Sequence, residues 1–297
     1  NCDDGTGAGC KNTYYCIDET DTCTPNLIGT NANVTCTSGN ICLQYVRYFS
    51  QDNVDNNESV NTSEQTRIDK ENPTTTFSGC TAGWHNTDKE ITLNCDDGSG
   101  SSCDGTTYRI DGGAWNNYTI PFSLSTDLNH QIDYNSIDAV GNQETIKTSY
   151  CAIDKTAPSV QATTFSGFTI FGAFINGVGT ILGGVATDIL SGIDQATCEY
   201  TINGGGDWLT AFWDTDHCQV TNVTIVDGQD YNASTRVDDN AGNTGTGAYT
   251  GNYTGDTTPP TTDDNSSTDW TATNQTITLN CDDGTGAGCK NTYYCID

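Results

Sequence analysis

The sequence predicts an all-β protein, organised as a tandem array of antiparallel β-sandwich domains that disulfides hold together. Apolar and polar residues alternate over short segments such as Ile91–Leu93 and Ile132–Tyr134, as in strands with one buried face. Turn-forming residues recur about every 8–12 residues, which is the spacing expected of a sandwich, and no segment has a helical period. The 297 residues include 15 cysteines and 32 glycines, which suits small cores strengthened by disulfides.

A long repeat organises the chain. The first eighteen residues, Asn1–Asp18, are identical to the last eighteen, Asn280–Asp297, and both read NCDDGTGAGCKNTYYCID. Chance does not produce such an identity, so the chain holds one period of 279 residues and an overlap. Because methionine and a signal peptide are absent, we expect an internal stretch of a longer secreted or surface protein.

Each period contains three related units. A gapless copy of the first segment, NCDDGSGSSCDGTTYRID, occupies Asn94–Asp111, and a more divergent copy occupies Ala186–Gly204. An Asp-rich turn follows each copy, and each unit ends in an Asp-x-x-x-Pro linker. The turns are Asp52–Asn56, Asp138–Asn142 and Asp239–Asn243, and the linkers are Asp69–Pro73, Asp154–Pro158 and Asp256–Pro260.

These linkers divide the chain into four segments. We expect residues 1–72 to be the C-terminal part of the first unit, whose N-terminal part is residues 260–297 of the preceding repeat. Residues 73–157 form the second unit, residues 158–259 form the third, and residues 260–297 begin the next copy of the first unit. The prediction is therefore three sandwich domains in each 279-residue repeat.

The succession of motifs resembles a known group of domains. The second unit carries, in order, Trp84, the DDGSG loop, YRIDGGAW, SIDAVGN and IDKTAP. This order resembles the Ig-like repeats of large bacterial and archaeal surface proteins, close to the OmpL47-type repeats. The third unit, with VATDILSGID and VDDNAGN, is similar to a neighbouring Ig-like variety, and the first unit resembles a cysteine-rich one. The resemblance covers essentially the whole chain and implies Ig-like sandwiches that serve as spacers, stalks or adhesin shafts.

The composition excludes several functions. A net charge of −29, from 39 acidic and 10 basic residues, leaves no basic face for nucleic acid. The apolar run 168–186 contains five glycines and Asn176, so we interpret it as strands and expect no membrane-spanning segment. No nucleophile elbow, zinc-peptidase motif or phosphate loop is present, and we predict that the protein is not an enzyme. The cysteines indicate an oxidising compartment, hence an extracellular or cell-surface location.

The cysteines predict seven disulfides, one of them in the repeated overlap. Without the repeated Cys281, Cys289 and Cys295, twelve cysteines remain per period, divided six, four and two among the units. The Cys-x-x-Cys spacing that zinc sites favour is absent. The predicted pairs are Cys2–Cys10, Cys16–Cys23, Cys36–Cys42, Cys80–Cys151, Cys95–Cys103, Cys198–Cys218 and Cys281–Cys289, with Cys16 joined to Cys36 or Cys42 as the alternative.

Calcium is the one cofactor that the sequence suggests. Solvated surface aspartates are the simpler explanation of the negative charge. The positions of some acids favour a metal instead, because a late loop of one unit can meet the linker of an adjoining unit, and Ca²⁺ accepts six to eight hard oxygen ligands. The spacing of an EF-hand is absent. The candidate ligands are Asp138, Asn142, Asp154, Asp239, Asn243 and Asp256.

We therefore predict a structural protein, a repeat of an extracellular or cell-surface filament, stalk or sheath whose partners are neighbouring copies of itself. The alternative is an adhesin shaft or glycan-binding surface module that exposes aromatic side chains such as Trp208 and Trp213. Identical repeats favour the structural role, because they provide length. Asn-x-Ser/Thr sequons in a secreted chain also predict a glycoprotein. They lie at Asn33, Asn57, Asn61, Asn117, Asn222, Asn232, Asn252, Asn265 and Asn274.

Overall fold

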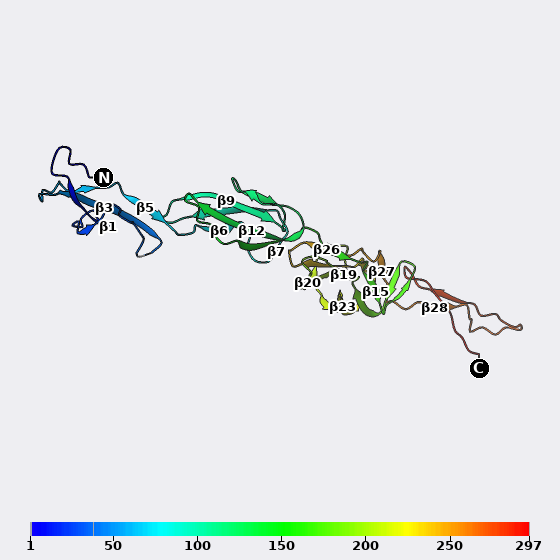
Figure 1. Cartoon of the computed structure of the whole chain (residues 1–297). Helices are drawn as coiled ribbons and strands as arrows, with labels where there is room; N and C mark the ends of the chain where they lie inside the picture. The colour runs from blue at the N-terminus through cyan, green and yellow to red at the C-terminus, as the bar shows by residue number, and fades with distance from the viewer. Residues whose placement is uncertain (1, 38, 297) are drawn as a thin grey trace. The chain divides into compact units, whose positions relative to one another are not determined.

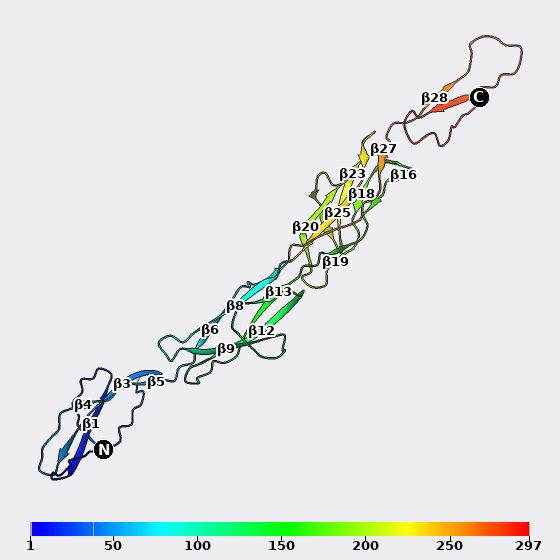
Figure 2. The same ribbon diagram turned by 90° about the horizontal axis from the view of Figure 1, so that it is seen from above.

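The computed structural model describes residues 2–37 and 39–296, and this part of the chain forms strands, turns and loops without a helix (Figures 1 and 2). The predicted all-β class is confirmed. None of these residues belongs to a helix that could cross a membrane. The chain divides into two compact units. The first contains Asn1–Thr81, Lys89–Leu124 and His130–Cys151, and the second contains Ala82–Asp88, Ser125–Asn129 and Ala152–Asp297.

The first 72 residues contribute one antiparallel sheet to the first unit, in the order β2-β1-β3-β4, with β5 also paired to β3. The strands are β1 (Cys10–Asp18), β2 (Leu27–Ile28), β3 (Ile41–Asp52), β4 (Asn61–Thr62) and β5 (Thr66–Asp69). Cys16 and Cys42 are buried, whereas Leu43 and Tyr48 remain exposed. A single layer thus leaves part of its apolar surface uncovered, where a sandwich would have a second sheet.

The same compact unit contains a sandwich in which the sheet β11-β8-β6 faces the sheet β10-β9-β12-β13. Ile91 and Leu93 on β8 and Ile132 on β12 are buried, and Phe77 of β6 stacks on Tyr134 of β12 with ring centroids 5.9 Å apart. These are alternating positions, so the period-two pattern marks the face that packs inward. The strands are β6 (Thr74–Ser78), β8 (Lys89–Asp96), β9 (Cys103–Ile110), β10 (Asn116–Asn117), β11 (Phe122–Leu124), β12 (Leu128–Asp138) and β13 (Lys147–Ile153). β7 (Trp84–His85) belongs to the second compact unit, where it pairs in parallel with Ala152 and Ile153 at the end of β13.

A polar network around Glu144 is buried in this sandwich. Its Oε1 accepts a hydrogen bond from the Thr75 N–H at 2.9 Å, and its Oε2 accepts one from the Thr75 hydroxyl at 2.6 Å. Lys147 forms an ion pair with Glu144 and donates to the Thr75 carbonyl at 2.8 Å. Burial raises the pKa of Glu144, but the hydrogen bonds from Lys147 and Thr75 outweigh it and hold the pKa below its ordinary value.

Replacing Glu144 by glutamine should therefore lower the free energy of unfolding at pH 7 by about 2 kcal/mol, the usual range for hydrogen bonds to a charged group. Because the folded-state pKa is depressed, this stabilisation is present above the unfolded pKa and is lost as pH falls through the folded one. Urea denaturation at pH 7 and at pH 3 measures both effects. The exposed Glu90 on β8 gives a matched control, Glu90→Gln. Equal losses in the two variants at pH 7, or a loss in Glu144→Gln that is as large at pH 3, would contradict the prediction.

Residues 158–259 of the second compact unit contain four sheets, in the orders β14-β19, β15-β18-β23-β22, β16-β17-β27-β24 and β21-β20-β25-β26. Cys198 on β20 and Cys218 on β23 join two of these sheets, and they pack with Val237 in one core cluster. Ile175 and Tyr231 form part of a second cluster. The strands are β14 (Ser159–Val160), β15 (Thr164–Ser166), β16 (Thr169–Phe171), β17 (Phe174–Asn176), β18 (Val178–Leu182), β19 (Ala186–Thr187), β20 (Ile193–Thr201), β21 (Leu209–Thr210), β22 (Phe212–Asp214), β23 (His217–Thr224), β24 (Asp230–Tyr231), β25 (Ser234–Asp239), β26 (Thr244–Thr246) and β27 (Tyr253–Gly255). The apolar run 168–186 is thus strand, as predicted.

The last segment of the second unit is a hairpin of β28 (Thr261–Asp264) and β29 (Leu279–Asp282), visible beside the C-terminus in Figure 2. Its register, Thr261 opposite Asp282, matches the register of β6 and β8, where Thr74 lies opposite Asp96. Residues 283–296 contain no strand, although residues 10–18, which have the same sequence as 289–297, form β1. The same sequence thus forms a strand in its first copy but none in the described residues 289–296 of its second copy.

Residues 2–37 and 39–296 form seven disulfides. Six of them close loops of short sequence separation or join neighbouring strands, whereas Cys80–Cys151 has a separation of 71 residues. Cys295 is a free, exposed thiol, whereas Cys16, which stands at the same place in the first copy of the segment, is bonded to Cys23. The disulfides are Cys2–Cys10, Cys16–Cys23, Cys36–Cys42, Cys80–Cys151, Cys95–Cys103, Cys198–Cys218 and Cys281–Cys289.

Candidate metal sites at repeated aspartate clusters

The loop after β12 is built around Asp138. Its Oδ1 accepts hydrogen bonds from the N–H groups of Val140 at 3.0 Å and Asn142 at 2.8 Å, and its Oδ2 accepts one from the Asn142 side chain at 2.7 Å. Burial raises the pKa of Asp138, but these hydrogen bonds outweigh it and keep the pKa below its ordinary value. The Asn142 amide also donates to the Asp69 carbonyl at 3.2 Å, which ties this loop to the Asp-x-x-x-Pro linker that precedes the sandwich.

The Asp-Asp-Gly loop between β8 and β9 brings a second acid to the same linker. Asp97 Oδ2 accepts the N–H of Ser102 at 2.8 Å, and Asp69 Oδ2 accepts the N–H of Ser101 at 2.6 Å. A Cβ atom at Gly100 would lie 2.6 Å from the Oδ2 atoms of both Asp69 and Asp97. Only glycine leaves room for the two carboxylates to approach at this position.

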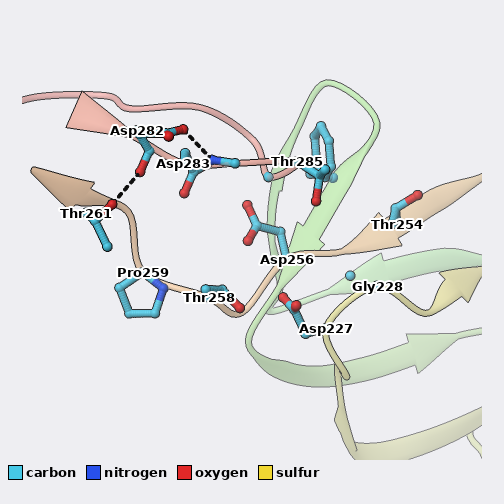
Figure 3. Close-up of a pocket in the computed structure, with 14 residues that line it drawn as sticks. Asp227, Gly228, Thr254, Asp256, Thr258, Pro259, Thr261, Asp282, Asp283 and Thr285 are labelled. Atoms are coloured by element: carbon cyan, nitrogen blue, oxygen red, sulfur yellow. Dashed lines mark hydrogen bonds between the residues drawn. The ribbon is translucent and has the colours of Figure 1, made fainter. Parts of the chain in front are cut away.

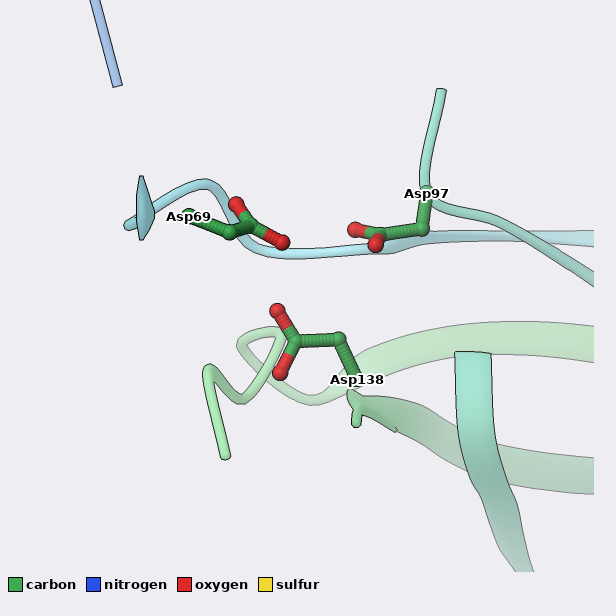
Figure 4. A group of neighbouring side chains, drawn as sticks. All are labelled: Asp69, Asp97 and Asp138. Atoms are coloured by element: carbon green, nitrogen blue, oxygen red, sulfur yellow. The ribbon is translucent and has the colours of Figure 1, made fainter. Parts of the chain in front are cut away.

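Asp69, Asp97 and Asp138 thus converge, and Figure 4 shows their carboxylates directed toward one another. One carboxylate oxygen from each lies within 4.8 Å of the others. Asp138 is 2% exposed and Asp97 is 9% exposed, and Asp97 Oδ1 is a buried oxygen without a hydrogen-bond partner. In the described residues, no lysine or arginine forms an ion pair with any of the three. Three neighbouring carboxylates without a cation, two of them buried and Asp69 half-buried, repel one another, and an unpartnered buried oxygen is costly.

The second compact unit repeats this arrangement with Asp154, Asp188 and Asp239, whose oxygens also lie within 4.8 Å of one another. Asp154 is fully buried, and its Oδ2 accepts the Ser191 N–H at 3.0 Å. The Asn243 amide donates to Asp239 Oδ2 at 2.7 Å and to the Asp154 carbonyl at 2.9 Å. The hydroxyl oxygen of Ser191 is buried without a partner beside these acids. In both sandwiches the acid of the preceding linker (Asp69 or Asp154) therefore meets two loops. One is the loop of Asp97 or Asp188, called here the acidic loop, and the other is the loop of Asp138 or Asp239, called the late loop.

A third linker shows two of the three parts. Asp256 Oδ2 accepts the Ala287 N–H at 2.7 Å, and Asp283 Oδ2 accepts the Gly288 N–H at 2.6 Å. Asp256, Asp283 and Asp227 line one pocket (Figure 3), but the backbone N–H of Thr257 and the side chain of Thr258 hold the pKa of Asp227 below its ordinary value. Asp227 is thus bonded to the linker, and among the described residues no loop like that of Asp138 lies beside Asp256.

The structure shows where each of the six predicted calcium ligands lies. Asp138 lies with the linker that precedes its own sandwich, and Asp239 lies in the same way with Asp154. Asp256 belongs to the incomplete third cluster. The side chains of Asn142 and Asn243 act as donors that position an aspartate and a linker carbonyl.

Sequence reasoning missed Asp69, Asp97, Asp188 and Asp283. Asp97 and Asp283 lie in Asp-Asp-Gly, which is read most simply as a turn, whereas Asp188 stands outside that motif and Asp69 in a linker. One signal could have pointed to them. The second aspartate of Asp-Asp-Gly, Asp97 or Asp283, recurs together with the first aspartate of the preceding Asp-x-x-x-Pro linker, Asp69 or Asp256.

The chemistry of these clusters suits calcium. Two ligands on opposite sides of Ca²⁺, each 2.3–2.6 Å from the ion, are about 5 Å apart, which matches the spacing of the carboxylate oxygens. Each cluster offers only oxygen, and hard oxygen donors favour Ca²⁺ over zinc or copper. Three carboxylates supply three to six oxygens, and water can complete the coordination.

The sequon asparagines and the two tryptophans that were expected on the surface differ in exposure. Eight of the nine sequon asparagines are exposed, and the half-buried Asn232 donates to Asn252 at 2.8 Å. Trp208 and Trp213, expected to be exposed, are half-buried. Arg236 covers the ring of Trp208 at 4.3 Å from the centroid, and Trp213 packs against the core cluster of Cys198.

Comparisons with known proteins complete the description. No family model matches the chain, and no curated protein matches it significantly. Among solved structures, the chain is similar to a tetra-tandem repeat from the extending region of a large adhesion protein, with 16% identity, a TM-score of 0.33, and coverage of 85% of this chain and 68% of the other. It is also similar to fibronectin domains 1–3 of chicken CNTN1, with 9% identity, a TM-score of 0.29, and coverage of 83% and 88%. A Bacteroides ovatus protein, SGBP-B of a mixed-linkage glucan utilization locus in complex with a heptasaccharide, shows 12% identity, a TM-score of 0.16, and coverage of 84% and 60%.

Proposed function

We propose that this chain is a repeating segment of an extracellular or cell-surface filament, stalk or sheath, with three sandwich domains in each 279-residue repeat. The disulfides support an oxidising location, because such bonds form and persist outside the cytosol. The sandwich boundaries that we propose are residues 73–157 and 158–259, with the first domain assembled from residues 260–297 and the continuation of the repeat. The partners are neighbouring copies of the repeat.

The observation that carries this proposal is that one arrangement of linker, acidic loop and late loop recurs along the chain. Asp69 meets Asp97 and Asp138, and in the same way Asp154 meets Asp188 and Asp239. We propose that Ca²⁺ binds at each complete cluster and fixes the linker to the sandwich that follows it. Such an ion would replace repulsion between acids by attraction, so a chain with a charge of −29 could remain stiff.

A filament of this kind should show a regular axial repeat in electron micrographs. Strands of six to eight residues rise about 3.3 Å per residue, so a sandwich with its linker spans about 35–40 Å and three of them span about 100–120 Å. Filaments of the native protein, imaged with Ca²⁺ present, should therefore repeat at roughly that distance. An axial repeat near 40 Å would contradict the linear array, because it would require the domains to fold back or stagger.

We also propose that the exposed sequons carry glycans, since the turns and strand edges on which they lie are accessible to a transferase. Hydrophilic glycans on a protein of this charge would keep neighbouring filaments apart. The intact mass of the native protein before and after enzymatic deglycosylation measures their presence, and an unchanged mass would refute this part of the proposal.

A further inference from the structure

One serine of the acidic loop lies at each complete aspartate cluster. The Ser101 N–H donates to Asp69 Oδ2 at 2.6 Å, and the Ser191 N–H donates to Asp154 Oδ2 at 3.0 Å. Both serines are thus bonded through their backbone to the acid of the linker that precedes the sandwich. Because a serine hydroxyl oxygen is only three covalent bonds from the nitrogen of its own residue, each hydroxyl also lies close to that carboxylate.

The hydroxyl oxygens of these two serines are buried, and neither has a hydrogen-bond partner among the described residues. Ser191 as a whole is 9% exposed. In the first cluster (Asp69, Asp97, Asp138), Asp97 Oδ1 is a further buried oxygen that no described residue bonds. An oxygen that is removed from water and not bonded again is costly, so these atoms point to a ligand that the protein binds here.

The fold of the acidic loop does not require these hydroxyl groups. Ala287 stands at the position of Ser101 in the repeated loop, and its N–H donates to Asp256 Oδ2 at 2.7 Å. The contact with the linker acid therefore forms equally with alanine. A serine hydroxyl is present, and buried, at the two linkers where three carboxylates converge. The hydroxyl is thus free for a role other than shaping the loop.

The surroundings of each hydroxyl favour a cation. In the second cluster (Asp154, Asp188, Asp239), one oxygen of each carboxylate lies within 4.8 Å of the others, and Asp154 and Asp239 are buried. No lysine or arginine in the described part of the chain forms an ion pair with these acids. A hydroxyl oxygen has two lone pairs, so it can bind a cation while its proton bonds to a carboxylate. A hard, neutral oxygen of this kind suits Ca²⁺.

We propose that the hydroxyl oxygens of Ser101 and Ser191 are calcium ligands, one in each complete cluster. The inference rests on the proposed function, since it names a further ligand of the calcium site proposed there. Each serine then acts on the linker twice, because its N–H positions the linker carboxylate and its hydroxyl binds the same ion as that carboxylate. Three carboxylates and one hydroxyl leave about two to four coordination places for water or for second carboxylate oxygens.

The test isolates one cluster at a time in the 297-residue chain. Asp97→Asn leaves the second cluster intact, and Asp188→Asn leaves the first cluster intact. Isothermal titration calorimetry then measures the affinity of the remaining cluster for Ca²⁺. Ser191→Ala should weaken binding about tenfold in the Asp97→Asn chain, because water replaces a positioned ligand. In the Asp188→Asn chain, the same substitution should leave the affinity unchanged. Ser101→Ala should show the reverse pattern, so each serine variant is the control of the other.

Two further measurements separate a ligand from a merely structural residue. With EGTA, neither serine variant should melt at a lower temperature, because alanine removes a buried oxygen that has no partner among the described residues. With one equivalent of Tb³⁺ in place of Ca²⁺, luminescence lifetimes in H₂O and D₂O count the O–H bonds on the ion. This count should rise when the serine of the intact cluster is replaced, because water brings two O–H bonds where the hydroxyl had one.

The inference is overturned if the serine variants keep the original affinity for Ca²⁺, or if the count of O–H bonds does not change. It is also overturned if the variants lose as much stability with EGTA as with Ca²⁺, since the hydroxyl then supports the fold rather than the ion. All three outcomes leave the carboxylates as the site, and the calcium part of the proposed function stands. If the original protein binds no Ca²⁺, both the inference and that part of the proposed function fail.

Discussion

Replacing both Cys80 and Cys151 by alanine should lower the free energy of unfolding of the sandwich β6–β13 by about 4.4 kcal/mol. This disulfide joins residues 71 apart in sequence, and the loop-entropy model gives a larger effect for a longer closed loop. Cys151 is buried at the end of β13, so the bond ties the beginning of the domain to its last strand. Urea denaturation followed by the fluorescence of Trp84 and Trp115 measures the loss.

The matched control is the double alanine variant at Cys95 and Cys103, whose separation is only eight residues. The same model gives a loss of about 2.6 kcal/mol for that loop. The longer disulfide should thus be worth nearly 2 kcal/mol more than the shorter one. Equal losses would mean that the effect comes from native-state packing rather than from constraint of the unfolded chain.

Addition of Ca²⁺ should raise the free energy of unfolding of each sandwich that carries a complete cluster by about 2.7 kcal/mol at a concentration 100 times the dissociation constant. Asp97→Asn and Asp188→Asn should each abolish the gain in one sandwich. Without Ca²⁺, neither variant should be less stable than the original protein, because each removes a repelling charge and an asparagine oxygen can still accept the loop N–H groups. Thermal unfolding with Ca²⁺ and with EGTA gives these differences.

Asp96→Asn is the control for this measurement. Asp96 is the exposed neighbour of Asp97 in the same loop, and its carboxylate accepts the Gly98 N–H outside the cluster. The variant changes the net charge by the same amount but should keep the full response to calcium. A melting temperature that does not move with Ca²⁺, or a response that Asp97→Asn leaves intact, would show that the acids of the cluster are not metal ligands.

The sequence by itself determined the length of the repeat, the class of fold and the positions of the turns and linkers. The identity of Asn1–Asp18 with Asn280–Asp297 reveals the 279-residue period without any structure. Alternation over short segments such as Ile91–Leu93 marks a strand with one buried face, because side chains on a strand point to opposite sides in turn. These signals are local, so they can be read from neighbours in the chain.

Only the tertiary structure decided which acids meet. Asp69, Asp97 and Asp138 come from a linker, a hairpin loop and a late loop, and the pairing of β9 with β12 brings the two loops to one end of the sandwich. Nothing in an Asp-Asp-Gly turn shows that its second carboxylate points toward a linker. The different structure of the two copies of the repeated segment has the same kind of cause. Cys10–Asp18 form β1 because β3 supplies their backbone partners, whereas the described residues 289–296 form no strand, since a lone strand cannot satisfy its own hydrogen bonds.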